Sequence, residues 1–242
     1  MAKSILLILL MFAAFIGKAQ NIVYDENAEV RVVEPFSGID ISGAVSLYLS
    51  QGTQQGVAIS AGELKYNEKI KTEVKNGILH ISVDGGVWNG FNWTNRKLKA
   101  YVTAVSINRL SVSGASYASI DGEIKSEDLK IGISGASEVK GMVEVNSLKL
   151  DVSGASVARL SGSASNASLE ASGACKINSY DLKIANCKAS SSGASDIKVT
   201  VTGELNGDAS GGSNIYYKGA GMGKSLNTSG GASIKNRSQN DD

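Results

Sequence analysis

The sequence predicts an all-β protein, a parallel β-helix with about 19 residues in each coil. A short phrase returns as SGAS at Ser113, Ser134 and Ser153, SGAC at Ser172, SGAS at Ser192, SGGS at Ser210 and SGGAS at Ser229, with starts 21, 19, 19, 20, 18 and 19 residues apart. Apolar and polar residues alternate before each phrase, as in Leu129, Ile131 and Ile133, which is typical of a half-buried strand. No helical spacing separates these strands. A two-sheet β-sandwich is the alternative architecture.

Each Ser-Gly pair predicts a turn, because glycine adopts positive φ angles at little cost. The small residues after it are expected to stack from coil to coil, about 4.8 Å apart. They are Ala115, Ala136, Ala155, Ala174, Ala194 and Gly212. A second strand is expected to begin with Val139, Ile177, Ile197 and Ile215, each five residues after the serine of its own coil. Val143 with Val145 indicates a third strand, so each coil is expected to carry two or three.

Residues 1–19 have the pattern of a secretory signal peptide. Lys3 supplies a positive start, Ile5 to Ile16 an apolar run of 12 residues, and Ala19 a small-residue cleavage site. Twelve residues are too few to cross a bilayer as a helix. We therefore expect export through the Sec pathway to the periplasm, the outer-membrane surface or the medium, and no transmembrane segment in the mature chain.

The charge balance argues against nucleic acid as the main partner. Without Lys3 and Lys18, 22 basic residues remain against 23 acidic ones, a formal charge of −1. Nucleic acid and anionic membranes both call for a concentrated basic surface. With one proline in the chain, we expect a single β-helix domain over residues 30–234. Residues 20–29 lead into it and residues 235–242 form a polar tail.

Residues 30–112 are expected to form less regular coils that begin and cap the solenoid, before the regular coils of residues 113–234. A first strand is predicted from Val30 to Val33, and the corner phrase first appears at Ser42, 71 residues before its next copy. Asn76-Gly77 predicts a hairpin between residues 70–74 and 78–83. Further strands are predicted within residues 45–49, 57–61, 97–105 and 107–112.

Several segments of the chain together resemble one known family. They are Phe36–Ala44 (FSGIDISGA), Leu64–Val74 (LKYNEKIKTEV), Gly77–Ile81 (GILHI), Lys97–Val102 (KLKAYV) and Leu110–Ser116 (LSVSGAS). In this order they resemble the putative auto-transporter adhesin head domain family, or GIN domain, over roughly residues 30–234. The resemblance implies a right-handed β-helical protein of the bacterial cell envelope with a proposed role in adhesion. It carries over no site residues.

An aromatic segment is the first candidate contact site. Trp88, Phe91 and Trp93 lie in a stretch rich in glycine and asparagine. Aromatic side chains on such a loop can stack against a sugar or dock a protein. The alternative is that the tryptophans fold back and plug the open end of the solenoid.

An acidic pair is the second, weaker candidate. Asp151 and Glu170 each stand two residues before a corner serine and are 19 residues apart. They are therefore expected on adjacent coils, where they could bind a cation or act as an acid/base pair. The alternative is an outward polar face with scattered charge.

No catalytic, cofactor or metal constellation is found. His80, the one histidine, is expected to point away from the core. Gly219–Ser225 resembles a phosphate-binding loop but lacks its first glycine and a following helix, so we interpret it as an ordinary loop. Cys175 and Cys187 are expected as buried free thiols rather than a disulfide.

The function expected from the sequence is therefore non-catalytic binding or adhesion at the cell envelope, with a glycan or protein as ligand. The alternatives are a polysaccharide-binding or polysaccharide-degrading envelope protein and a structural subunit that assembles end to end.

Overall fold

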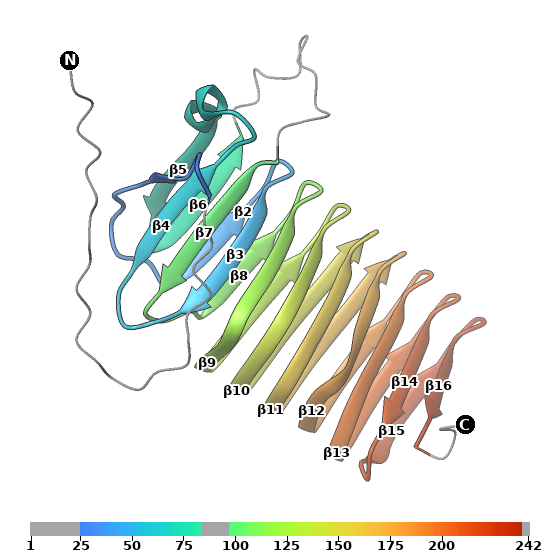
Figure 1. The fold of residues 1–242 in the computed structure, drawn as a ribbon. Coiled ribbons are helices and arrows are strands. Elements are labelled where there is room, and N and C mark those ends of the chain that lie inside the picture. The colour runs from blue at the N-terminus through green and yellow to red at the C-terminus, as the bar shows by residue number, and fades with distance from the viewer. Residues whose placement is uncertain (1–24, 84–96, 239–242) are drawn as a thin grey trace, which may run out of the picture.

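The chain forms a β-solenoid of about 7 turns, stacked along one axis. The structure is a computed structural model, and it describes residues 25–83 and 97–238. Figure 1 shows the coils following one another from the N-terminal strands to the C-terminal strands. Within those two ranges, no helix has the length and apolar content needed to cross a membrane.

Five long strands each make one whole coil that bends around the axis. They are β9 (Tyr117–Ile133), β10 (Glu138–Gly154), β11 (Val157–Gly173), β12 (Lys176–Ser191) and β13 (Asp196–Ala209). All pair in parallel with their neighbours. This parallel register confirms the β-helix and rules out the sandwich, whose sheets would be antiparallel.

Each coil presents three faces, which we name by their order after the corner. In β10, face A contains residues 138–140, face B residues 142–145 and face C residues 147–152. The predicted second strand lies on face A, where its alternate residues point inward. Val139, Ile177, Ile197 and Ile215 are all 0% exposed. The predicted third strand lies on face B, and both Val143 and Val145 are buried.

The corners are held by glycine rather than by the residue after it. We expected the alanines to be the crowded members, but Ala136, Ala155 and Ala174 are exposed. The glycine before each alanine lies against the backbone of the preceding corner: a Cβ on Gly154 would stand 2.5 Å from the carbonyl oxygen of Gly135. Ala155 N–H donates to that same oxygen at 2.8 Å. The tight column is therefore the glycine column.

The fourth residue of the corner phrase builds a ladder of buried serines. Ser116, Ser137 and Ser156 are each 2% exposed or less. The backbone N–H of Val45 donates to Ser116 Oγ, that of Ser116 to Ser137 Oγ, and that of Ser137 to Ser156 Oγ, at 3.2–3.3 Å. Each hydroxyl thus satisfies a buried amide of the neighbouring coil, which would otherwise be costly to bury.

The first corner lies directly beside the second despite the 71 residues between them. Ala44 N–H donates to Gly114 O at 3.0 Å. The intervening chain is an insertion between adjacent coils, and it forms most of the N-terminal end. The strands of that end are β2 (Gly38–Ile41), β3 (Ser46–Gln51), β4 (Gly56–Ser60), β5 (Ile70–Lys75), β6 (Ile78–Val83), β7 (Lys99–Ala104) and β8 (Arg109–Val112).

Antiparallel pairing marks the N-terminal end of the stack. Strand β4 pairs antiparallel with β7, and β5 pairs antiparallel with β6. The β5–β6 turn is the predicted hairpin, with φ of 52° at Asn76 and 72° at Gly77. A six-residue 3₁₀ helix, η1 (Leu64–Lys69), joins β4 to β5 and had not been predicted.

The predicted first strand over Val30 to Val33 is wrong in extent. Only β1 (Glu29–Val30) forms, antiparallel to β4. Val30 and Val32 are 76% and 100% exposed, whereas Val33 packs against the core. Strand β1 is the outermost strand of its sheet, so no further strand covers its side chains.

The C-terminal end consists of β14 (Asn214–Lys218), β15 (Met222–Thr228) and β16 (Ser233–Asn236). Strand β15 pairs with β13, and β16 with β14, both in parallel. Most of the segment that resembles a phosphate loop is therefore strand, not the loop we expected. It lacks the helix that such a site requires.

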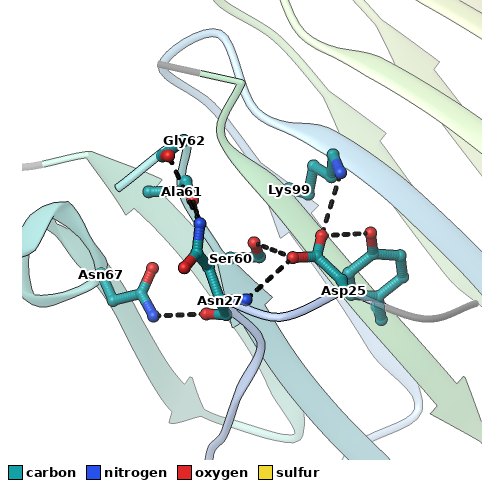
Figure 2. A network of polar contacts seen from close by, with 8 residues as sticks. Asp25, Asn27, Ser60, Ala61, Gly62, Asn67 and Lys99 are labelled. Carbon is teal, nitrogen blue, oxygen red and sulfur yellow. Dashed lines mark hydrogen bonds and ion pairs between the residues drawn. The ribbon is translucent and has the colours of Figure 1, made fainter. Parts of the chain in front are cut away.

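A polar network ties the start of the described chain to the N-terminal sheet (Figure 2). One carboxylate oxygen of Asp25 accepts from Lys99 Nζ at 2.9 Å and from the Tyr101 hydroxyl at 2.8 Å, and the other accepts from Ser60 Oγ at 2.9 Å. Burial by itself raises the pKa of Asp25, but these donors outweigh it and lower the pKa to about 2.

We expect the Asp25 network to stabilise the protein at neutral pH and to fail in strong acid. Because the folded pKa lies below the unfolded value of 3.8, the contribution is complete above about pH 4 and is lost as pH falls toward 2. The shift corresponds to about 2 kcal/mol. The measurement is the melting temperature of wild type and Asp25→Asn between pH 7 and pH 2. The difference should be largest at neutral pH and should vanish near pH 2; a constant difference would contradict this assignment.

Candidate functional site

An acidic row runs along face C and borders an open groove. The row consists of the residues two before each corner serine, and the register pairs them in sequence as Asp151, Glu170, Ser190, Asp208 and Asn227. The groove has a volume of about 390 Å³ and is lined by this row, the corner serines and the residues between them. It has a carboxylate-rich and hydroxyl-rich wall.

The predicted pair of Asp151 and Glu170 stands at adjacent positions in this row. Lys149 Nζ lies 3.6 Å from Asp151 and 4.0 Å from Glu170. The Asp151 and Glu170 side chains are 48% and 58% exposed, although Asp151 Oδ1 is buried and has no hydrogen-bond partner among the described residues. The pair as a whole lacks the enclosed setting in which glycosidase carboxylates act as general acids. Their arrangement is that of a surface ion-pair group, which can accept hydrogen bonds from ligand hydroxyls.

Metal binding finds no support among the residues that the structure describes. In residues 25–83 and 97–238, no three His, Cys, Asp or Glu side chains are placed to hold an ion. Lower in the acidic row, the Asn227 amide donates to Asp208 at 2.8 Å. That carboxylate is therefore already engaged with a protein donor.

A second row, on face A, was missed by sequence reasoning. It consists of the residues six after each corner serine, together with Tyr101 of the inserted strand β7. We call it the tyrosine–lysine row. From the N-terminal end it reads Tyr101, Tyr48, Ser119, Lys140, Arg159, Asn178, Lys198, Tyr216 and Lys235. Reading the sequence at a constant offset from the corners would have found it.

Aromatic rings contact other rings or cations at three places along this row. Tyr48 and Tyr101 stack with ring centroids 5.3 Å apart and an interplanar angle of 19°. Lys140 Nζ lies 5.5 Å from the centroid of Tyr117, and the Arg237 guanidinium lies 5.0 Å from that of Tyr216. These contacts hold the aromatic rings and the charged groups in defined positions on a rigid sheet.

The aromatic candidates cannot be placed. Trp88, Phe91 and Trp93 fall in residues 84–96, outside the described residues. Their role as a contact site, or as a plug, stays a prediction.

The histidine and the two cysteines considered in the sequence analysis are held in contacts within the fold. His80 is half-buried, with Nδ1 3.6 Å from Asp40 Oδ2. Cys175 and Cys187 are both buried and free, as expected. Burial raises the pKa of both thiols, that of Cys187 to about 12. Cys175 takes the place of a ladder serine, and its thiol donates to Val152 O at 3.2 Å.

Comparison with known proteins gives one family and a set of similar folds. The family model described as "Putative auto-transporter adhesin, head GIN domain" matches residues 35–221. No curated protein matches the sequence.

Among solved structures, a putative adhesin from Bacteroides fragilis is 24% identical, with a TM-score of 0.79, over 86% of this chain and 95% of its own. A putative adhesin from Parabacteroides merdae is 16% identical (TM-score 0.67; 86% and 95% covered). A putative lipid binding protein from Parabacteroides distasonis is 19% identical (0.63; 88% and 97%). At these identities the likeness shows the fold alone.

Proposed function

The chain belongs to the auto-transporter adhesin head GIN domain family, and from this membership we propose that it is an exported, non-catalytic binding protein that mediates adhesion at the cell envelope. Its ligand would be a glycan or a protein. Export by residues 1–19 is part of the proposal.

The observation that carries the proposal is the registered display of side chains on a rigid stack. Each column of the repeat returns to the same face in every coil, as in the pairs Asp151–Glu170 and Lys140–Arg159. An extended ligand that crosses the coils can meet one row at many points. Individually weak contacts then add up through multivalency.

The alternative function, an enzyme that degrades polysaccharide, has less support than adhesion. The acidic pair is open to water and shares Lys149 as an ion-pair partner. The two carboxylates face the same cation on the same sheet, with no enclosed pocket between them.

The test is an array of glycans and host-matrix proteins probed with the purified protein and with a Trp88→Ala/Trp93→Ala double variant. We expect the wild type to bind at least one class of ligand. The double variant should lose affinity if aromatic side chains of residues 84–96 contact that ligand. Leu64→Ala, which shortens an exposed apolar side chain on η1, is the matched control and should bind like wild type.

Absence of binding to every glycan and matrix protein would contradict the adhesion proposal. Unchanged binding in the double variant would remove Trp88 and Trp93 from the contact surface while leaving adhesion standing. A melting temperature for each variant ensures that a loss of binding is not a loss of fold.

A further inference from the structure

The tyrosine–lysine row of face A is a line of side chains without a carboxylate. Its members come from successive coils, and its cations are Lys140, Arg159, Lys198 and Lys235. The register of β11 and β12 is interrupted between Arg159 and Asn178, which line one hollow. The strands of a sheet are about 4.8 Å apart. The row therefore presents positive charge and polar groups at a repeat set by the backbone, over almost the whole length of the solenoid.

Two carboxylates beside the row have partners on face A. Glu138, on the neighbouring column, forms an ion pair with Arg159, so this member of the row is already compensated. Asp196 accepts a hydrogen bond from the Asn214 amide at 2.9 Å. Lys198 and Lys235 have no ion pair with another described residue. The row thus keeps positive charge without a carboxylate partner at Lys198 and Lys235.

Face C differs in this respect and supplies a contrast within the same molecule. There the lysine column adjoins the acidic row, and Lys149 is shared between Asp151 and Glu170. Face C thus mixes acidic and basic side chains, whereas the tyrosine–lysine row itself has no acidic member.

A hollow opens in the middle of the tyrosine–lysine row. Its volume is about 310 Å³, and Lys140, Arg159 and Asn178 line it. Ser119 and Ser161 add hydroxyl groups, and Asp181 is the carboxylate among its lining residues. Such a hollow offers Lys140 for an acidic substituent, beside an Arg159 that Glu138 already pairs, and several neutral partners for hydroxyl groups, which is what an acidic sugar unit presents.

Aromatic rings lie at the N-terminal end of the same row. The Tyr48 and Tyr101 rings form a stacked pair, and Tyr101 is fixed by its hydroxyl, which donates to Asp25. A tyrosine ring offers an apolar body to the C–H face of a sugar and a polar tip to its hydroxyls. Because the ring positions are fixed before binding, little conformational entropy is lost on contact.

We propose that the tyrosine–lysine row binds an extended anionic polysaccharide that lies along the solenoid axis and carries a carboxylate or sulfate on its repeating units. This inference rests on the proposed adhesion function and names its ligand class. A polymer extended along the axis can bring its acidic groups to the cations of the row and its hydroxyl groups to the neutral members. Duplex nucleic acid fits less well, because the positive row is one residue wide and is bordered by Glu138 and Asp196.

The experiment measures binding of the purified protein to immobilised polygalacturonate, chondroitin sulfate, neutral dextran, poly-glutamate and duplex DNA. We expect binding to polygalacturonate or chondroitin sulfate that weakens as salt is raised, and none to dextran. The comparison of the first two polymers separates carboxylate from sulfate recognition. Equal or stronger binding to poly-glutamate or DNA would overturn the assignment to polysaccharide.

The decisive variant is Lys140→Gln/Lys198→Gln, with Lys130→Gln/Lys188→Gln on face C as the matched control. Both remove two positive charges from strands of the regular coils, and Lys130 and Lys188 are exposed. The face A variant should lose about tenfold in affinity, and the face C variant should bind like wild type. Equal affinities, or equal losses, would overturn the proposal.

Tyr48→Ala supplies a second test that leaves the charge unchanged. It should weaken polysaccharide binding while the melting temperature stays within the range of the other surface variants. If the protein binds other array ligands but the face A variants behave like wild type, the row is not the site and the adhesion function stands. Binding to no ligand of any class would remove both.

Discussion

Gly154→Ala is expected to destabilise the solenoid by about 2–4 kcal/mol. Gly154 has a φ of +72°, a left-handed conformation that costs an ordinary residue about 1–2 kcal/mol. The new Cβ would also stand 2.5 Å from Gly135 O. Relief of that overlap would separate two corners and weaken the hydrogen bond from Ala155 to Gly135.

The measurement is thermal unfolding followed by circular dichroism. For a domain of this size the loss corresponds to a fall in melting temperature of about 5–15 °C. Gly132→Ala is the matched control, since Gly132 has no positive φ and a Cβ there would meet nothing within 4 Å. If both variants melted together, the glycine column would not be what sets the corner.

Leu169→Ala is expected to cost about 2–5 kcal/mol, the range for a leucine truncated in a packed core. Leu169 is 0% exposed in the third regular coil, where it pairs with Leu150 on one side and Ala189 on the other. The backbone ladders hold the coils at a fixed spacing, so the neighbouring coils cannot close around the missing volume. A cavity should therefore remain.

Urea denaturation of Leu169→Ala and Leu226→Ala compares the same truncation at two places in the stack. Leu226 lies in β15, which pairs with β13 at the C-terminal end, and is 41% exposed, so its loss should cost less than about 1 kcal/mol. Because repeat proteins are stabilised mainly by contacts between neighbouring coils, the interior variant should also unfold less cooperatively. Equal midpoints for the two variants would mean that the interior is not close-packed.

The regular half of the fold could be read from the sequence because its signals are local. The alternation of Leu129, Ile131 and Ile133 specifies a strand from residues that touch each other along the chain. Asn76-Gly77 specifies its hairpin through its own backbone preference. The same alternation of apolar and polar residues recurs in every coil, which is why the buried columns were predicted correctly.

For the candidate sites, residue spacing predicts which side chains are neighbours but not which contacts they make. A constant spacing placed Asp151 and Glu170 at the same position of adjacent coils, and the register agrees. The compensation of their charges by Lys149 required the side-chain geometry. Most of the tyrosine–lysine row could have been found in the sequence, because its members stand six residues after each corner serine. Only the strand register shows that Tyr101 of the insertion lies beside Tyr48.

By itself the sequence determined the period, the corners, the inward columns and hence the class of fold, because each depends on neighbours within one coil or one repeat. Only the tertiary structure decided that the corner at Ser42 lies beside the corner at Ser113, that glycine rather than alanine is the crowded residue, and that Asp25 is bound by Lys99 and Tyr101. The first and the last of these contacts join residues 70 or more positions apart, which leave no periodic trace in the chain. The glycine contact joins adjacent coils, but which of two small residues is crowded depends on how closely the backbones pack.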